Sequence, residues 1–223
     1  MTTATNPVAR SPLPLEALLD QRPDLWRGRA RGRSLPPGVP TGHAALDREL
    51  PWGGWPTGSL VELLVAHPGE GLGLVVPALV RLSLDVRWVL LLDPPWRPFA
   101  PALAARGLAL ERLVVVAAGE RLAWSAEQGL RSGACSAVLV WGGRWQGAAL
   151  RRLQLAAQDG DALVVLFRDV AAARNPSPAP LRLRVAGTGA GYRVEVLKRR
   201  GARPGAVLDL GEVCPDGRIR RSG

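Results

Sequence analysis

The residues that come nearest to a chemical motif lie in the stretch VELLVAHPGEGLGL, residues 61–74. An apolar run, a glycine-rich loop and a second apolar run form the pattern of a strand, a turn and a helix whose backbone N–H groups surround a phosphate. A working loop also needs a lysine for the phosphate oxygens and a hydroxyl residue for magnesium. Aligned after the initial Val-Glu-Leu, the first glycine, second glycine, lysine and hydroxyl positions of the motif carry Val65, Glu70, Gly71 and Leu72. The sequence therefore predicts a degenerate phosphate-binding loop.

The chemistry of this loop argues against a bound triphosphate. Lys198 is the only lysine of the chain and lies far from the loop in sequence. Glu70 would place a negative charge where the phosphates sit, and like charges repel strongly in a poorly solvated site. Gly69, Gly71 and Gly73 leave two interpretations open: a tight turn with close helix packing, which glycine permits, or a remnant of an anion-binding nest. We favour the tight turn.

The length and composition limit the number of domains, the cellular location and the class of partner that we expect for this protein. With 223 residues, of which 47% are hydrophobic, the chain can bury one substantial core but not two ordinary domains. No window approaches the roughly 20 apolar residues of a membrane helix, and the first residues lack the apolar core of a signal peptide, so we expect a cytoplasmic protein without membrane contact. The net charge of +10 suits a nucleic-acid partner, although a GC-rich coding bias toward arginine explains part of it. The two cysteines and two histidines form no metal-ligand spacing.

Five apolar runs predict the strands that position the loop: residues 59–66, 86–93, 112–118, 136–141 and 161–167. They are nearly continuous in Val and Leu, which is typical of parallel strands buried on both faces. Helical segments separate them, so the predicted fold is α/β, with a mostly parallel sheet flanked by helices. Residues 181–200 alternate apolar and charged side chains around a glycine-rich turn and predict an antiparallel hairpin at the sheet edge. Trp88 lies inside a predicted strand, and we expect it in the core.

The two ends of the chain differ from this core. Residues 1–33 are predicted to form a tail and an amphipathic helical arm, residues 34–212 the core domain, and residues 213–223 a basic tail. One face of the arm is apolar, and we expect it to bind a partner. The predicted partner-binding residues of this arm are Leu15, Leu18, Leu19 and Trp26.

The order of these segments resembles the core of RecA-type recombinases, from about residue 41 to about residue 210. The resemblance is carried by TGHAALDRELPWGGWPTGSLVEL (41–63), WVLLLD (88–93), ARGLALERLVVV (105–116) and VEVLKRRG (194–201). Taken with the N-terminal arm and the overall length, the chain is most similar to the ImuA family, RecA-like accessory proteins of bacterial mutagenic translesion DNA synthesis. The resemblance implies a RecA-like core with an antiparallel C-terminal hairpin.

The same resemblance implies that the catalytic positions of the recombinases carry other residues in this chain. The catalytic glutamate of the recombinases falls on Pro95, the magnesium-associated aspartate near Trp141 or Gly142, and the glutamine that senses the γ-phosphate near Asp169. These replacements predict a protein that uses no nucleotide cofactor and is not an enzyme. Trp96 and Trp141 follow strands at the ends where the nucleotide would lie, and they are predicted to fill its space.

In recombinase filaments the loops after the fourth and fifth strands face DNA, and here both loops are short. By this resemblance, together with a basic pair on the helix between them, weak and non-specific nucleic-acid contact is predicted for Arg144, Trp145, Arg151, Arg152, Arg168 and Arg174. The family further implies an adaptor of the translesion-synthesis mutasome in SOS damage tolerance. Its expected partners are an ImuB-type inactive polymerase homologue and, beyond it, an error-prone replicative-type polymerase subunit or the RecA filament. Two alternatives stay open: an ATPase with an unconventional nucleotide site, and a cell-division inhibitor distantly related to the recombinases.

Overall fold

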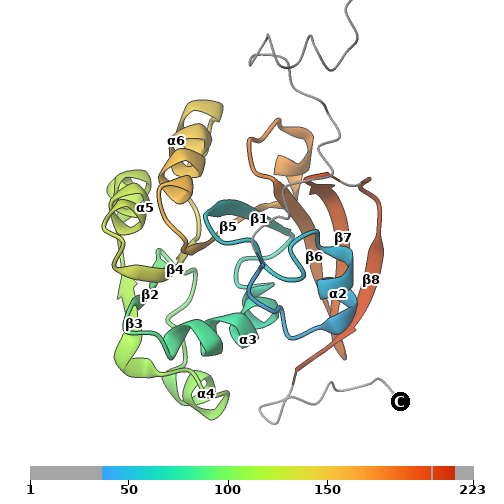
Figure 1. Ribbon diagram of the computed structural model, residues 1–223, viewed down its shortest axis with the longest axis horizontal. Helices are drawn as coiled ribbons and strands as arrows, with labels where there is room; N and C mark the ends of the chain where they lie inside the picture. Colours follow the sequence, from blue (N-terminus) through green and yellow to red (C-terminus); the bar gives the residue numbers. More distant parts are fainter. Residues whose placement is uncertain (1–36, 202, 214–223) are drawn as a thin grey trace, which may run out of the picture. The chain divides into compact units, whose positions relative to one another are not determined.

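The computed structural model describes residues 37–201 and 203–213 (Figure 1). The predicted N-terminal arm, with Leu15, Leu18, Leu19 and Trp26, lies outside the described residues, as does segment 214–223 of the predicted basic tail. Among the described residues, no helix has the length and apolar content that crossing a bilayer requires.

Strands and helices alternate along most of the described chain. The strands are β1 (Ser59–Val65), β2 (Trp88–Leu92), β3 (Leu113–Val116), β4 (Cys135–Val140), β5 (Leu163–Asp169), β6 (Leu181–Thr188), β7 (Gly191–Arg199) and β8 (Val207–Gly211). The α-helices are α2 (Ala44–Glu49), α3 (Leu72–Ser83), α4 (Ala100–Ala105), α5 (Leu122–Arg131) and α6 (Gly147–Gln158). Three short 3₁₀ turns complete the order: η1 (Leu110–Arg112), η2 (Gly119–Arg121) and η3 (Val170–Arg174).

The strands form one eight-stranded sheet in the order β3-β2-β4-β5-β1-β6-β7-β8. The pairs from β3 to β6 are parallel, while β7 and β8 each run antiparallel to the preceding strand. The predicted mostly parallel α/β sheet and its C-terminal hairpin are therefore confirmed. Strand β8 extends the hairpin by one further strand that the sequence patterns did not predict.

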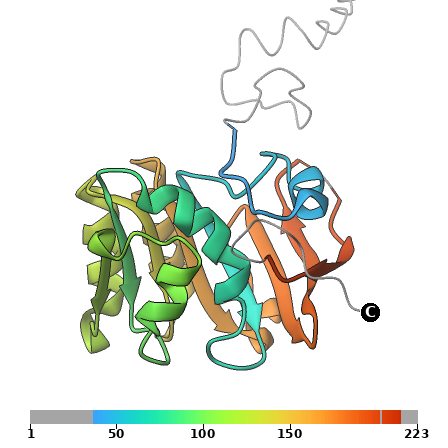
Figure 2. The same ribbon diagram turned by 90° about the horizontal axis from the view of Figure 1, so that it is seen from below.

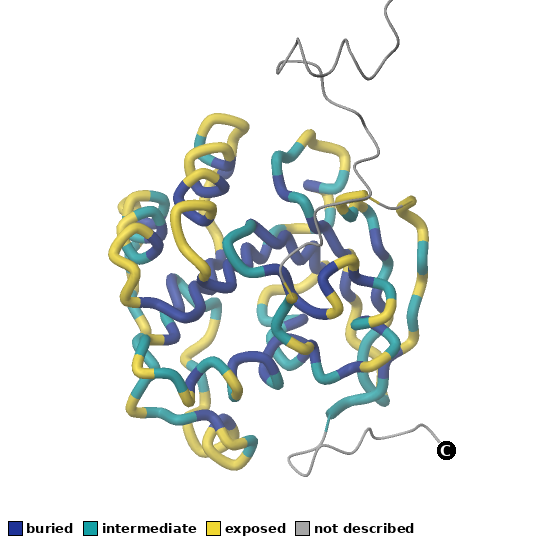
Figure 3. Tube along the Cα trace, viewed as in Figure 1, coloured by how far each residue is buried: buried dark blue, intermediate teal, exposed yellow. Residues whose placement is uncertain are grey.

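The sheet separates two apolar cores. Helices α2, α3 and α4 contribute Leu46, Leu74 and Leu103 to the core on one face, and α5 and α6 contribute Leu130 and Leu153 to the core on the other. Figure 2 shows α3 and α4 together on one side of the strands. The central strands are buried on both faces, whereas the outward faces of the helices are exposed (Figure 3). Continuous Val and Leu runs are required because each central strand packs against both helical layers.

Two expectations fail at the edge of this sheet. Strand β3 is only partly buried, since it is the last strand in the sheet order and has a neighbour on one side only. Trp88, expected in the core, is 40% exposed at the first residue of β2. The guanidinium of Arg112 lies 5.6 Å from its ring centroid, so this tryptophan takes part in a surface cation–π contact.

Candidate functional site

The degenerate phosphate-binding loop has the predicted strand–loop–helix form. Strand β1 ends at Val65, a turn covers residues 66–71, and α3 begins at Leu72. Gly69 and Gly71 have φ angles of +90° and +81°, in the left-handed region that favours glycine. A Cβ added at Gly73 would lie 2.0 Å from the phenol oxygen of Tyr192. The tight turn and close packing that we favoured for these glycines therefore match the structure.

The Glu70 carboxylate folds back onto its own loop. Its Oε2 accepts a hydrogen bond from the backbone N–H of His67 at 3.2 Å, and the Glu70 N–H in turn donates to the His67 carbonyl at 3.2 Å. In a working phosphate-binding loop such N–H groups point at the phosphates. Here the Glu70 carboxylate accepts the hydrogen bond of one such N–H group, that of His67. The same carboxylate places a negative charge at the loop.

A pocket of about 460 Å³ opens beside this loop. It lies at the carboxyl ends of β1, β2, β4 and β5, where ligands of open α/β sheets bind. Its lining includes Val65 of the phosphate-binding motif and the predicted catalytic positions Pro95, Trp141, Gly142 and Asp169, whereas the motif positions Glu70, Gly71 and Leu72 lie outside the lining. The predicted catalytic positions are thus brought together, and none of them carries a lysine, a catalytic glutamate or a glutamine.

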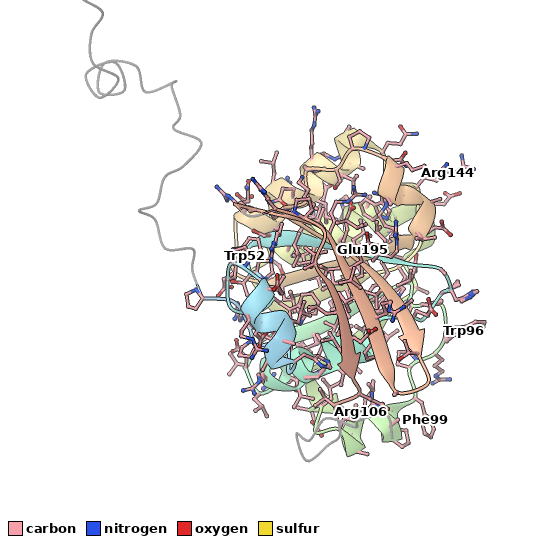
Figure 4. All side chains as sticks on the ribbon, turned by 90° about the vertical axis from the view of Figure 1, so that its right-hand side faces the viewer. Trp52, Trp96, Phe99, Arg106, Arg144 and Glu195 are labelled. Atoms are coloured by element: carbon pink, nitrogen blue, oxygen red, sulfur yellow. The ribbon has the colours of Figure 1, made fainter. Side chains whose placement is uncertain are left out.

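Aromatic side chains form one wall and the rim of the pocket. Trp141 is buried and stacks on Phe167, with ring centroids 4.5 Å apart and planes 4° from parallel. Trp96 is 71% exposed, and its Nε1 lies 3.4 Å from the Pro68 carbonyl oxygen. The expectation that both rings fill the nucleotide space holds for Trp141 as part of the wall. It is wrong for Trp96, which lies beside Gly69 and projects outward at the periphery of the molecule in Figure 4.

Two carboxylates of the pocket support neighbouring backbone. Asp93, at the end of β2, accepts hydrogen bonds from the N–H groups of Ala118 at 2.5 Å and Gly119 at 3.0 Å. Asp169 Oδ1 accepts from the Ala171 N–H at 2.7 Å and so caps η3. Both groups add negative charge to the pocket. Among the described residues, no cluster of three or more His, Cys, Asp or Glu side chains is arranged to hold a metal ion.

A buried ion cluster beneath the pocket joins β1 to its neighbours. The fully buried Glu62 accepts hydrogen bonds from Arg168 Nη1 at 3.1 Å, Ser177 Oγ at 2.8 Å and Arg182 Nε at 2.7 Å. Arg168 also donates to the Trp145 carbonyl at 3.2 Å, and Arg182 donates to the Ala172 carbonyl at 2.7 Å. One carboxylate therefore anchors both the loop after β4 and the turn after β5.

This cluster corrects two of the predicted nucleic-acid contacts. The Arg168 side chain is only 10% exposed and its charge is paired with Glu62. Trp145 is buried, and its Nε1 donates to the Gly142 carbonyl at 2.7 Å. Neither side chain is presented for a phosphate or a base, because the short loop folds inward onto the sheet.

The other four predicted contacts lie on the surface. Arg144, Arg151 and Arg174 are exposed and have no acidic partner among the described residues, whereas Arg152 pairs with Glu127 at 2.9 Å. Figure 4 shows Arg144 at the periphery of the molecule.

The sequence patterns missed the Glu62 cluster. Its signal was an isolated acidic residue within an apolar strand, together with an arginine at position 182 in the later hairpin.

Comparison with solved structures agrees with this geometry. The crystal structure of the RadB recombinase matches with a TM-score of 0.62 at 13% identity, covering 80% of this chain and 97% of RadB. The fold is RecA-like. The same comparison finds 440 matching chains, so the fold alone does not select a function.

The other comparisons concern a segment of the chain. The family model of the cell division inhibitor SulA matches residues 61–164, just under half of the chain. The crystal structure of SulA from Pseudomonas aeruginosa is 30% identical, covers 48% of this chain and 96% of that chain, and has a TM-score of 0.41. No curated protein matches. The chain therefore carries a SulA-like segment within a RecA-like fold, and the comparisons do not single out the ImuA family.

Proposed function

We propose that the protein is a non-catalytic RecA-like adaptor that binds other proteins. The observation that carries this proposal is the composition of the pocket at the carboxyl ends of the strands. Pro95 and Trp141 of the pocket stand where a nucleotide-hydrolysing relative needs a glutamate and an aspartate, and Gly71 in the adjoining loop stands where it needs a lysine. Asp93 and Asp169 add negative charge to the pocket and Glu70 adds it to the adjoining loop, which opposes the binding of a triphosphate.

The partners follow from the sequence resemblance to the ImuA family. We propose that the adaptor acts in translesion DNA synthesis during the SOS response, where it binds an ImuB-type polymerase homologue and, through it, a replicative-type polymerase subunit or RecA. Leu15 and Leu18 lie on the apolar face of the predicted arm. Their replacement by Asp should abolish capture of the polymerase homologue, and undiminished capture would remove the arm from this role.

Isothermal titration with ATP and magnesium tests the loss of nucleotide binding. We expect no binding heat up to millimolar ATP, with a RecA-type recombinase as the positive control. Binding at micromolar strength, about −8 kcal/mol, would overturn the proposal and favour an ATPase with an unconventional site.

DNA contact is a separate part of the proposal. Arg144 and Arg174 are exposed, and neither forms an ion pair with an acidic side chain among the described residues. They can therefore contact DNA phosphates independently of the base sequence. Binding to single-stranded DNA should weaken as salt rises, and each arginine replaced by Ala should lower the slope of log K against log salt by about 0.7. Arg152→Ala serves as the matched control, because this arginine is already paired with Glu127. Equal slopes in all variants would exclude these arginines from DNA contact.

The SulA match supports a second candidate, a protein binder that inhibits cell division. The match begins in β1 and ends at the second residue of β5, so it includes most of the strands that carry the pocket but not Phe167, Arg168 or Asp169. Affinity capture from DNA-damaged cells separates the two functions. Polymerase-type partners would support the adaptor, and recovery of the division GTPase without polymerases would support the inhibitor.

A further inference from the structure

The charge of the pocket is opposite to that of the chain. The chain as a whole carries a net charge of +10, yet the pocket presents the carboxylates of Asp93 and Asp169. The one cation in its lining, Arg168, is already neutralised by the buried Glu62. Asp169 is exposed, and its Oδ2 receives no hydrogen bond from the described residues. The pocket therefore favours a cationic group over a phosphate.

The rim of the pocket suits a planar cation in particular. Trp96 is 71% exposed and lies beside Gly69, where its indole is available for stacking. Guanidinium groups stack on tryptophan faces and pair with carboxylates, and an arginine can do both at once. Phe99, also exposed, lies on the same side of the molecule as Trp96 (Figure 4). An arginine-bearing peptide would cover apolar surface that otherwise faces water.

The described chain ends close to this pocket. Strand β6 is parallel to β1, β7 is antiparallel to β6, and β8 is antiparallel to β7. Strand β8 therefore runs in the same direction as β1, and its last residue lies at the sheet edge where the pocket opens. Glu212 then pairs with Arg106, whose Nη1 would lie 3.7 Å from a Cβ added at Gly73 in the first turn of α3.

The segment that follows has the matching chemistry and enough length. Residues 214–223 read CPDGRIRRSG, with three arginines, Arg218, Arg220 and Arg221, and one acidic residue, Asp216. Arg221 is eight residues beyond Val213 and can therefore reach about 27 Å in an extended chain. Four strand spacings of about 4.8 Å separate β8 from β5, which ends at Asp169, or about 19 Å, so the arginines can reach this carboxylate.

We propose that segment 214–223 binds back into the pocket, where an arginine pairs with Asp169 and stacks on Trp96. In this arrangement the segment competes with any protein partner that binds the pocket. The inference rests on the proposed function in one respect, namely that the pocket holds no nucleotide.

Contact quenching of a fluorescent label tests this proposal in the full chain. Cys214→Ser and Ser222→Cys leave thiols only at positions 135 and 222, and bimane is attached at position 222 because Cys135 is buried and should not react. Tryptophan quenches bimane on contact, so we expect quenched emission that Trp96→Phe restores. Trp124→Phe is the matched control: this tryptophan is 60% exposed on α5, whose helix packs against the core other than that of α3, and its loss should leave the quenching unchanged.

Further variants and conditions identify which residues form the contact between the segment and the pocket. Arg220→Ala together with Arg221→Ala should restore emission, and high salt should do so in part because it screens the pairing with Asp169. Emission that Trp96→Phe leaves unchanged would overturn the proposal. Quenching that grows with protein concentration would also overturn it, because the segment would then bind a second copy. If ATP with magnesium restores emission, the segment lies at the pocket as proposed, but the proposed loss of nucleotide binding fails.

Discussion

Replacing Glu62 by Gln should destabilise the fold more than the same change in a surface ion pair. The substitution keeps the size of the side chain and removes its charge. It leaves two guanidinium groups, on Arg168 and Arg182, whose side chains are only 10% and 8% exposed. Water cannot solvate these cations in place of the lost carboxylate, so the destabilisation comes from uncompensated buried charge.

The magnitude follows from the partners that remain. Removing one member of a buried ion pair typically costs 3–5 kcal/mol of unfolding free energy, as an order of magnitude about 4. Arg182 keeps its bond to the Ala172 carbonyl, Arg168 keeps its bond to the Trp145 carbonyl, and the new amide oxygen can still accept from Ser177. We therefore expect a loss near the lower limit, about 3 kcal/mol, which lowers the folding equilibrium constant by more than a hundredfold.

Urea unfolding followed by circular dichroism measures this loss. Glu195→Gln is the matched control, because the Glu195 side chain is 33% exposed and pairs with Arg184, whose side chain is 44% exposed. An exposed pair contributes about 0–1 kcal/mol. The reasoning is refuted if both variants unfold at the same urea concentration with the same slope, since the buried cluster would then contribute no more than a surface pair.

Three further substitutions test local features of the fold. Gly73→Ala should destabilise the protein, because the new Cβ would lie 2.0 Å from Tyr192 Oη; in a Tyr192→Phe background the same change should cost less unfolding free energy, because the nearest remaining ring atom, Cζ, lies 3.2 Å away. Trp145→Phe should lower unfolding free energy by about 1 kcal/mol through loss of the bond to Gly142, with DNA affinity unchanged in an anisotropy titration. Burial lowers the pKa of His43 from its ordinary 6.5, so stability should fall as pH drops below 6.5, and His43→Phe should flatten that decline in unfolding experiments.

Each of these has a contrary result. A glycine replacement that destabilises equally with and without the Tyr192 hydroxyl would place the steric conflict elsewhere. Weaker DNA binding by the Trp145 variant would mean that this side chain leaves its buried position to stack on bases. For His43 the sign is set by linkage: both states are neutral above pH 6.5, and below it the unfolded state takes up the proton first. An unchanged decline in the His43→Phe variant would assign the acid sensitivity to other groups.

Local sequence patterns were sufficient for the parts of the fold that depend on continuous burial. The runs at β1, β4 and β5 predicted parallel strands because each must be apolar on both faces. The loss of the phosphate-binding lysine was also readable from the sequence, since the chain has only Lys198 and this residue lies in β7. The recombinase alignment placed Pro95, Trp141 and Asp169 at one site, and these residues line one pocket.

The tertiary structure alone decided which charged and aromatic side chains are accessible. Arg168 and Trp145 follow strands in the way that surface contacts would, yet Glu62 on another strand draws the arginine inward and the loop buries the indole. Trp88 and Trp96 lie in or after apolar runs, as buried tryptophans also do. The sheet order and the direction of the loop nevertheless leave both side chains exposed. A local pattern reports what one segment can bury, whereas the pairing of charges and the exposure of rings depend on segments that meet only after folding.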